Sequence, residues 1–296
     1  MRVFYSSVSF ARLLLLISGV WLDPAAAAPV MPVSETIVLK APNADESDQF
    51  GSTVLLVGDF LFVGASREDG DGSSLDDNSL EDAGAVYVYT RESGSWKFDA
   101  YLKASEPESG AYFGSSLAFD AGTLVVGAPY EDVRPSEAGS VAIAGSAYVF
   151  TRQGTQWNSP VRLKPTPGPE SNLGGGAGAG VAILGDSLTI GCPAQDGGRV
   201  FIYQRSGNVW QQQAEFNKPF LFESGDFGQT VDLHGELLVV GRPFRLQERA
   251  RTCSGSYPVW KAIVWLTGPG SFPTGLDDHQ TSRSLEVTWL CQDGCC

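Results

Sequence analysis

Two glycines separated by 13 positions recur four times along the 296-residue chain, and this spacing constrains the fold more than any other feature (64−51, 127−114, 191−178, 241−228). Constant spacing between residues whose neighbours vary is typical of a repeated structural unit that stacks on its own copies. The four pairs are Gly51 and Gly64, Gly114 and Gly127, Gly178 and Gly191, and Gly228 and Gly241. The chain is therefore expected to fold as an array of similar units.

Each glycine pair belongs to a longer motif. A phenylalanine precedes the first glycine in three copies, and a small or charged residue and then proline or serine follow the second. The phenylalanines are Phe50, Phe113 and Phe227, with Ala177 in the third copy, and the prolines are Pro129, Pro193 and Pro243. We predict that these residues have a structural role that is repeated in every unit.

Each unit is predicted to contain four short strands. Apolar and β-branched runs bounded by glycine indicate buried strands, and the tight turn between the first two predicts a hairpin. The predicted first strands are 52–57, 115–119, 180–184 and 229–233, and the predicted second strands are 60–63, 124–126, 188–190 and 237–240. The predicted third strands are 85–89, 147–150 and 200–203, and fourth strands begin at Trp96, Trp157 and Trp210.

The fourth strand of each unit shows apolar or small residues at alternate positions, as in Trp96, Phe98, Ala100 and Leu102. Alternation with a period of two predicts one buried and one solvated face. Because the tryptophan recurs at a fixed place, nine residues after the aromatic residue within the third strand (96−87, 157−148, 210−201), we expect it to pack between units rather than to stack on a ligand.

These units predict an all-β protein built from four-stranded antiparallel blades of a β-propeller. Successive units begin 63, 64 and 50 residues apart (114−51, 178−114, 228−178), and such blades must stack to bury their faces. The chain holds three full units and the first half of a fourth, so we expect a partial propeller. Residues 37–41 resemble residues 101–104, and residues 37–40 are predicted to be the closing strand of a blade whose other strands come from the C-terminal part of the chain.

The Phe-Gly and Gly-Ala-Pro motifs resemble those of FG-GAP repeats, which form the propeller of integrin α subunits and occur in many secreted or surface proteins. The resemblance covers residues 34–246 and implies extracellular recognition or adhesion. Integrin-like repeats often carry an Asp-rich calcium loop between the two motifs, whereas this chain has only a tight turn there. The resemblance therefore implies the fold but names no ligand.

The two ends of the chain differ from the repeats. Residues 1–28 contain arginines, a short leucine-rich run and Ala25–Ala28, as in a secretory signal peptide cleaved after Ala27. No later segment is long enough to span a bilayer, so we expect a secreted protein. The repeat pattern stops after Phe244, and residues 247–296 carry four of the five cysteines. This tail is either a genuine extension or a misread gene end, and we expect it to be poorly ordered.

The net charge of −14 argues against nucleic acid or an anionic membrane as a partner, since both attract basic surfaces. We expect an extracellular protein or glycan as the partner, with self-association through unpaired blade faces as a further expectation. Cys192 occupies the position of Ala65 and Ala128, and is predicted to be a small buried residue rather than a ligand.

The loop 66–84 is the best candidate site because seven carboxylates crowd into it. Alternation of aspartate with glycine can bring carboxylates around a cation, and the candidate ligands of a weak calcium site are Asp69, Asp71, Asp76 and Asp77. The alternative is a solvated acidic loop without metal. No other cofactor is expected.

Catalysis has little support in the sequence. His234 and His279 are the only histidines, and no nucleophile and base can be paired. We expect a recognition module without catalysis of its own. The alternative is the propeller part of a secreted hydrolase that acts on carbohydrate or phospholipid through loop carboxylates.

Overall fold

The computed structural model describes residues 37–131, 134–135, 141–142, 145–166, 175–193, 198–217, 226–235, 237–246, 257–266 and 284–289. Over these residues the chain consists of strands and loops, and no helix there is long and apolar enough to cross a membrane. Residues 40–296 form one compact unit that holds every strand. The structure is all-β, as the glycine-bounded apolar runs predicted.

Blades 1 and 3 are four-stranded antiparallel sheets in which the strands follow one another in chain order. Blade 1 contains β1 (Phe50–Val57), β2 (Phe60–Ala65), β3 (Ala85–Glu92) and β4 (Ser95–Leu102). Blade 3 contains β12 (Gly180–Leu184), β13 (Ser187–Cys192), β14 (Arg199–Ser206) and β15 (Val209–Asn217).

Blade 2 has the same order, but its outer strand is divided. It contains β5 (Ser116–Asp120), β6 (Thr123–Ala128), β9 (Ser146–Gln153), and two short strands that both pair with β9, β10 (Gln156–Trp157) and β11 (Val161–Leu163). Pro160 lies between the two halves, where a residue without an N–H cannot continue a ladder. A separate ribbon pairs β7 (Arg134–Pro135) with β8 (Val141–Ala142).

Blade 4 continues past Phe244, where the sequence shows no third or fourth strand at the spacing of the other units; residues 262–266 and 285–289, which could be strands by sequence, belong to its last two strands. It contains β16 (Thr230–His234), β17 (Leu237–Leu246), β18 (Tyr257–Leu266) and β19 (Ser284–Trp289), paired in that order. The motif spacing is lost after β17, but the tail retains two apolar runs that can pair as strands. The fourth sheet therefore draws strands from both sides of residue 246.

Residues 37–40, predicted as a closing strand, lie outside any strand. The blade that this segment would close, built from the C-terminal part of the chain, already has a fourth strand, because the fourth sheet has the order β16-β17-β18-β19. Lys40 still contacts blade 1, because its carbonyl oxygen accepts a hydrogen bond of 2.8 Å from the Tyr89 hydroxyl.

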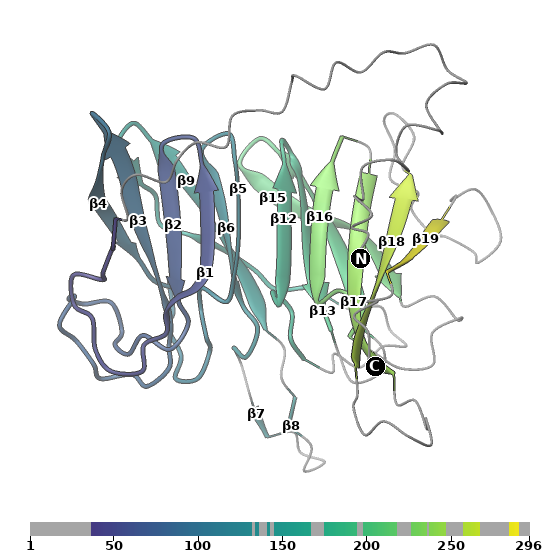
Figure 1. Ribbon diagram of the computed structural model, residues 1–296, viewed down its shortest axis with the longest axis horizontal. Coiled ribbons are helices and arrows are strands. Elements are labelled where there is room, and N and C mark those ends of the chain that lie inside the picture. Colours follow the sequence, from purple (N-terminus) through teal and green to yellow (C-terminus); the bar gives the residue numbers. More distant parts are fainter. Residues whose placement is uncertain are drawn as a thin grey trace, which may run out of the picture. The chain divides into compact units, whose positions relative to one another are not determined.

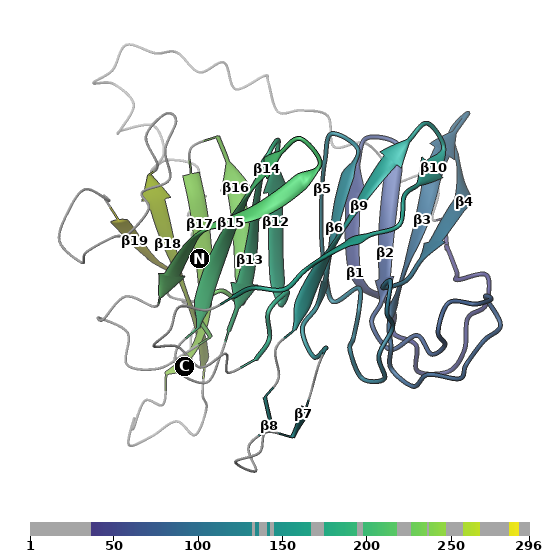
Figure 2. The ribbon, with the colours of Figure 1, turned by 180° about the vertical axis from the view of Figure 1, so that it is seen from behind.

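The blades stand in a row with their first strands as neighbours: β1 lies beside β5, β5 beside β12, and β12 beside β16 (Figures 1 and 2). The hydrophobic core consists of the joints between blades. We call the side of a blade that faces its successor the front face, and the side that faces its predecessor the back face. Blade 1's front face supplies Phe62, Val86, Val88 and Leu102, and blade 2's back face supplies Leu117, Phe119, Phe113 and Trp157.

The same joint recurs at equivalent positions further along the chain. Blade 2 contributes Val125, Val149 and Leu163 to the next joint, and blade 3 contributes Val181, Ile183 and Trp210. Blade 3 then contributes Val200, Ile202 and Phe216, and blade 4 contributes Phe227, Val231 and Leu233. Trp157 and Trp210 thus pack between units, as predicted from their fixed place in the repeat.

The glycine pair forms the closest backbone contact of each joint, and this explains the constant spacing. Within blade 2 the N–H of Gly114 donates to the carbonyl of Gly127 at 3.0 Å. The first glycines, Gly51, Gly114, Gly178 and Gly228, all have φ between 91° and 94°, a region open to glycine and strained for other residues. The carbonyl oxygen of the first glycine then lies against the second glycine of the preceding blade. A Cβ on Gly127 would be 1.9 Å from the oxygen of Gly178.

The outer strands contain a bulge that corrects the predicted alternation. On β3, Val88 pairs with Ala100 of β4 and Tyr89 pairs with Phe98, so Asp99 of β4 has no partner on β3 and forms a bulge. The pairing of β14 with β15 shifts in the same way between Ile202 and Tyr203. An extra residue reverses which face the following side chains occupy. Trp210 accordingly packs in the joint with blade 2, whereas Phe216 packs in the joint with blade 4.

Candidate functional site: the loops beyond the second strands

The acidic loop between β2 and β3 is held by its own carboxylates. Asp77 accepts the backbone N–H of Asp71 at 2.7 Å, Asp71 accepts that of Ser73 at 2.8 Å, and Asp69 accepts that of Asp82 at 2.7 Å. The backbone N–H of Gly70 donates to Leu80 at 3.0 Å and closes the loop. Three of the four predicted calcium ligands thus stabilise turns of the loop. Asp76 is exposed.

Within the described residues, no three side chains of the His, Cys, Asp and Glu types are grouped to hold a metal ion. The Lys103 ammonium instead lies against the loop, 3.5 Å from the carbonyl oxygen of Glu68 and 3.4 Å from that of Asp69. Burial lowers the pKa of Lys103 to about 8, although the surrounding carboxylates favour its charged form. An internal cation therefore balances part of the loop's charge, and the weak calcium site stays a prediction.

Glu68 is the buried centre of this region. Its side chain is 1% exposed, and its Oε1 accepts hydrogen bonds from Asn43 at 2.6 Å and from Tyr101 at 3.3 Å. Burial raises the pKa of Glu68, and the charge of Asp48 adds to that rise. Among the described residues its Oε2 finds no hydrogen-bond partner, which favours a carboxyl that keeps its proton to a higher pH than usual.

Glu131 occupies the equivalent place in blade 2. It is also 1% exposed, it accepts a hydrogen bond from the Tyr148 hydroxyl, and it lies 3.0 Å from an Arg162 nitrogen. Burial raises its pKa despite these partners. The carbonyls of both glutamates cap the following loop, because Gly84 donates to Glu68 at 2.8 Å and Gly145 donates to Glu131 at 3.0 Å.

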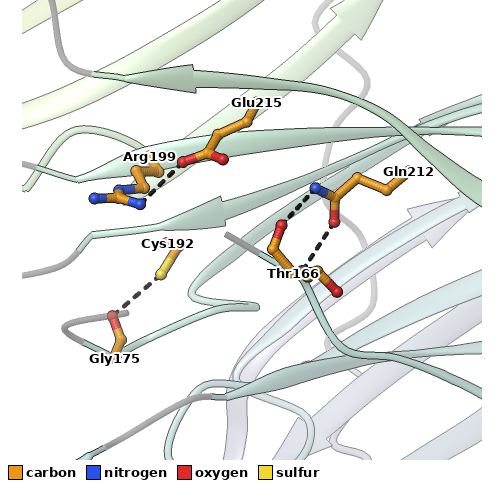
Figure 3. Close-up of polar contacts among 6 residues, drawn as sticks. All are labelled: Thr166, Gly175, Cys192, Arg199, Gln212 and Glu215. Atoms are coloured by element: carbon orange, nitrogen blue, oxygen red, sulfur yellow. Dashed lines mark hydrogen bonds and ion pairs between the residues drawn. The ribbon is translucent and has the colours of Figure 1, made fainter. Parts of the chain in front are cut away.

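Blade 3 has a different arrangement, shown in Figure 3. Phe201 replaces the tyrosine, and Arg199 pairs with Glu215 at 2.9 Å. Cys192 is fully buried, as predicted, and its thiol donates to the carbonyl of Gly175 at 3.4 Å. Burial raises the pKa of this thiol to about 12, so it is unsuited to bind a metal or to react at neutral pH. Gln212 exchanges two hydrogen bonds with the backbone of Thr166, at 2.9 and 2.8 Å.

An exposed aromatic cluster lies beside the acidic loop, where blades 1 and 2 meet. The Tyr112 and Tyr130 rings contact edge to face with centroids 5.2 Å apart, and the Arg67 guanidinium lies 5.5 Å from the centre of the Tyr112 ring. Tyr130 is 48% exposed. Tyr112 has a φ of 52°, a left-handed conformation that is strained for an aromatic residue and recurs at functional sites. Its hydroxyl donates to Asp82 at 3.2 Å.

Comparison with known families supports the interpretation of the repeats. The family described as FG-GAP repeat matches residues 33–89 and 96–150, which include blade 1 and most of blade 2. Residues 33–89 and 96–150 are FG-GAP repeats. A search of curated protein sequences found no match. FG-GAP repeats are typical of β-propeller protein-interaction modules, and the four antiparallel sheets described above have the form of propeller blades.

Two repeated features of the blades were missed in the sequence. The buried glutamates were treated as part of the solvated acidic loops, although both lie four residues after the second glycine (68−64, 131−127). An arginine also lies five residues before each tryptophan (96−91, 157−152, 210−205) and stacks on that ring at 5.8, 5.5 and 5.3 Å. Comparison of the copies at equal offsets could have found both.

Proposed function

We propose that this protein is a secreted recognition module that binds an extracellular protein through the loops beyond the second strands of blades 1 and 2. The observation that carries the proposal is the cluster of Arg67, Tyr112 and Tyr130, in which Arg67 and Tyr130 are exposed and Tyr112 is partly exposed. Tyrosine and arginine dominate binding energy at protein interfaces, because they offer large rigid area together with polar ends.

The surrounding charge indicates the kind of partner. The acidic loop beside the cluster carries exposed Asp71, Asp76 and Glu81, and a negative rim attracts a basic surface and repels acidic glycans. A protein with lysine or arginine at the contact therefore suits the loops best, and a neutral glycan is the second choice.

A hydrolase mechanism has weaker support. The two acids with raised pKa on equivalent loops, Glu68 and Glu131, would be the natural pair for such chemistry. Both are 1% exposed and accept hydrogen bonds from side chains of their own blades. A substrate cannot reach them without opening the loops, so we assign them a structural role and propose no catalysis.

Binding arrays separate these possibilities. The secreted protein would be applied to an array of extracellular proteins and to a glycan array, in parallel with a hydrolase panel. We expect binding on the protein array that is lost in a Tyr130→Ala/Arg67→Ala variant and retained in Lys97→Ala, which changes an exposed residue of β4. Hydrolysis of a panel substrate, or binding that the double variant leaves unchanged, would contradict the proposal.

A further inference from the structure

The three joints between blades are built alike, so the free faces at the two ends of the array can be compared with them residue by residue. Among the described residues, no blade packs on the back face of blade 1 and none packs on the front face of blade 4. We infer that these two faces are the halves of one further joint, and that a second copy of this chain supplies the missing half, blade 4 of one copy packing against blade 1 of the next.

The back face of blade 1 carries the residues that fill the other joints. Val54 and Leu56 stand where blade 2 has Leu117 and Phe119, and where blade 3 has Val181 and Ile183. In blade 3 these side chains are 7% and 8% exposed, whereas Val54 and Leu56 are each 62% exposed. Their positions in the repeat thus predict burial by a blade, and the described part of the chain does not supply one.

Blade 1 also has the stacked arginine and tryptophan that blades 2 and 3 use in their joints with the preceding blade. In blade 2 the Arg152 guanidinium reaches across the joint to Asp99 at 2.8 Å and lies 4.7 Å from the Phe60 ring centre. In blade 3 Arg205 reaches the Thr123 hydroxyl of blade 2 at 3.3 Å. Arg91 lies over Trp96 in the same way and pairs with Asp59 of its own blade, as Arg205 pairs with Asp186, but Arg91 is 51% exposed.

Only part of the back face is open. Tyr87 and Tyr89 are covered near residues 40–43, since Tyr87 donates to Asn43 and Tyr89 donates to Lys40, both at 2.8 Å. The uncovered part is the first strand, β1, with the hairpin end of the sheet. A docking blade must therefore bring its own first two strands to this place.

The front face of blade 4 carries the residues that would accept the first glycine of a following blade. In blades 1 and 2, Thr53 and Ser116 donate their hydroxyl hydrogen bonds to the carbonyls of Gly114 and Gly178 in the following blade, at 2.5 and 2.7 Å. Thr230 is the equivalent residue of blade 4 and is exposed, and the three atoms nearest to a Cβ built on Gly241 all belong to Thr230 of the same blade, with none from another blade. Gly51 of a second copy carries the carbonyl that fits there.

One residue weakens the match. Asp232 stands where blades 1, 2 and 3 have Leu55, Ala118 and Ala182, and burying a carboxylate in an apolar joint is unfavourable. We therefore expect a weak, concentration-dependent association rather than an obligate dimer. Because the two faces differ, the contact is head to tail, and such a contact produces a series of larger species unless it closes into a ring.

Sedimentation velocity of the full secreted chain over about a hundredfold range of concentration tests this proposal. A reducing buffer keeps the cysteines of residues 247–296 from linking copies. We expect the average mass to rise with concentration in the wild type. The rise should vanish both in Val54→Gln/Leu56→Gln, on the back face of blade 1, and in Thr230→Lys, on the front face of blade 4.

Val209→Gln is the matched control, because Val209 is 57% exposed and lies at the start of β15, outside both faces. Each variant must melt as the wild-type monomer does, and Asp232→Lys replaces Thr230→Lys if the latter misfolds. Mixing the two single-face variants should restore a species that stops at the dimer. A wild type that stays monomeric throughout, or an assembly that Val54→Gln/Leu56→Gln abolishes and Thr230→Lys leaves intact, would overturn the proposal.

Discussion

Replacing Gly127 by alanine should cost much of the stability of the joint between blades 2 and 3. The new Cβ would lie 1.9 Å from the carbonyl oxygen of Gly178 and 2.3 Å from the Ser116 hydroxyl oxygen. Overpacking of a rigid contact costs about 1–3 kcal/mol, and the displaced carbonyl also loses its hydrogen bond from Ser116, which is worth about 1 kcal/mol. We expect a loss of roughly 3 kcal/mol, or a fall in Tm of roughly 6–12 °C.

Gly241→Ala is the matched control for this experiment. Gly241 has the same place in the motif, but the only close contact of its added Cβ would be the Thr230 hydroxyl oxygen, at 2.1 Å; the Thr230 carbonyl oxygen lies at 3.6 Å, and an exposed hydroxyl can rotate away. We expect a change below about 1 kcal/mol when dilute protein is melted and followed by circular dichroism. Equal shifts for the two variants would show that the second glycine is required within a blade rather than at the joint, and would refute the reasoning.

The remaining predictions concern the buried carboxyl, the loop and the N-terminus. Because the folded pKa of Glu131 is raised, its contribution to stability is largest below its unfolded pKa and is lost as pH rises through the folded value. Acidification from neutral pH toward about 4.5 should therefore raise the Tm of the wild type relative to Glu131→Gln; a constant difference in Tm would contradict this. Titration calorimetry should show at most weak calcium binding, and Asp69→Ala/Asp71→Ala should abolish it; unchanged binding would remove these ligands. Export from a secretory host should yield a chain that begins at Ala28, and an intact N-terminus would disprove the signal peptide.

The sequence by itself determined the repeating unit and most of its strands. All eleven predicted first, second and third strands have a counterpart that begins within two residues of the predicted start. They could be placed from apolar runs between glycines because the first two strands of each unit are close in sequence and joined by a tight turn. These signals are strong because a tight turn and an apolar run are formed by residues that are close in sequence. The fixed position of the tryptophans likewise predicted packing between units, which Trp157 and Trp210 confirm.

Only the tertiary structure decided what the glycines and the outer strands do. A Cβ on Gly127 is excluded by a carbonyl 51 positions away in the next blade, and no local pattern records such a contact. The bulge at Asp99 reverses the faces of β4 because its ladder with β3 slips by one residue. β18 and β19 lack the motif, and they join the fourth sheet through backbone hydrogen bonds that any apolar strand can form. Side-chain patterns specify the hairpins, whereas pairing between distant segments is set by backbone geometry that the sequence does not display.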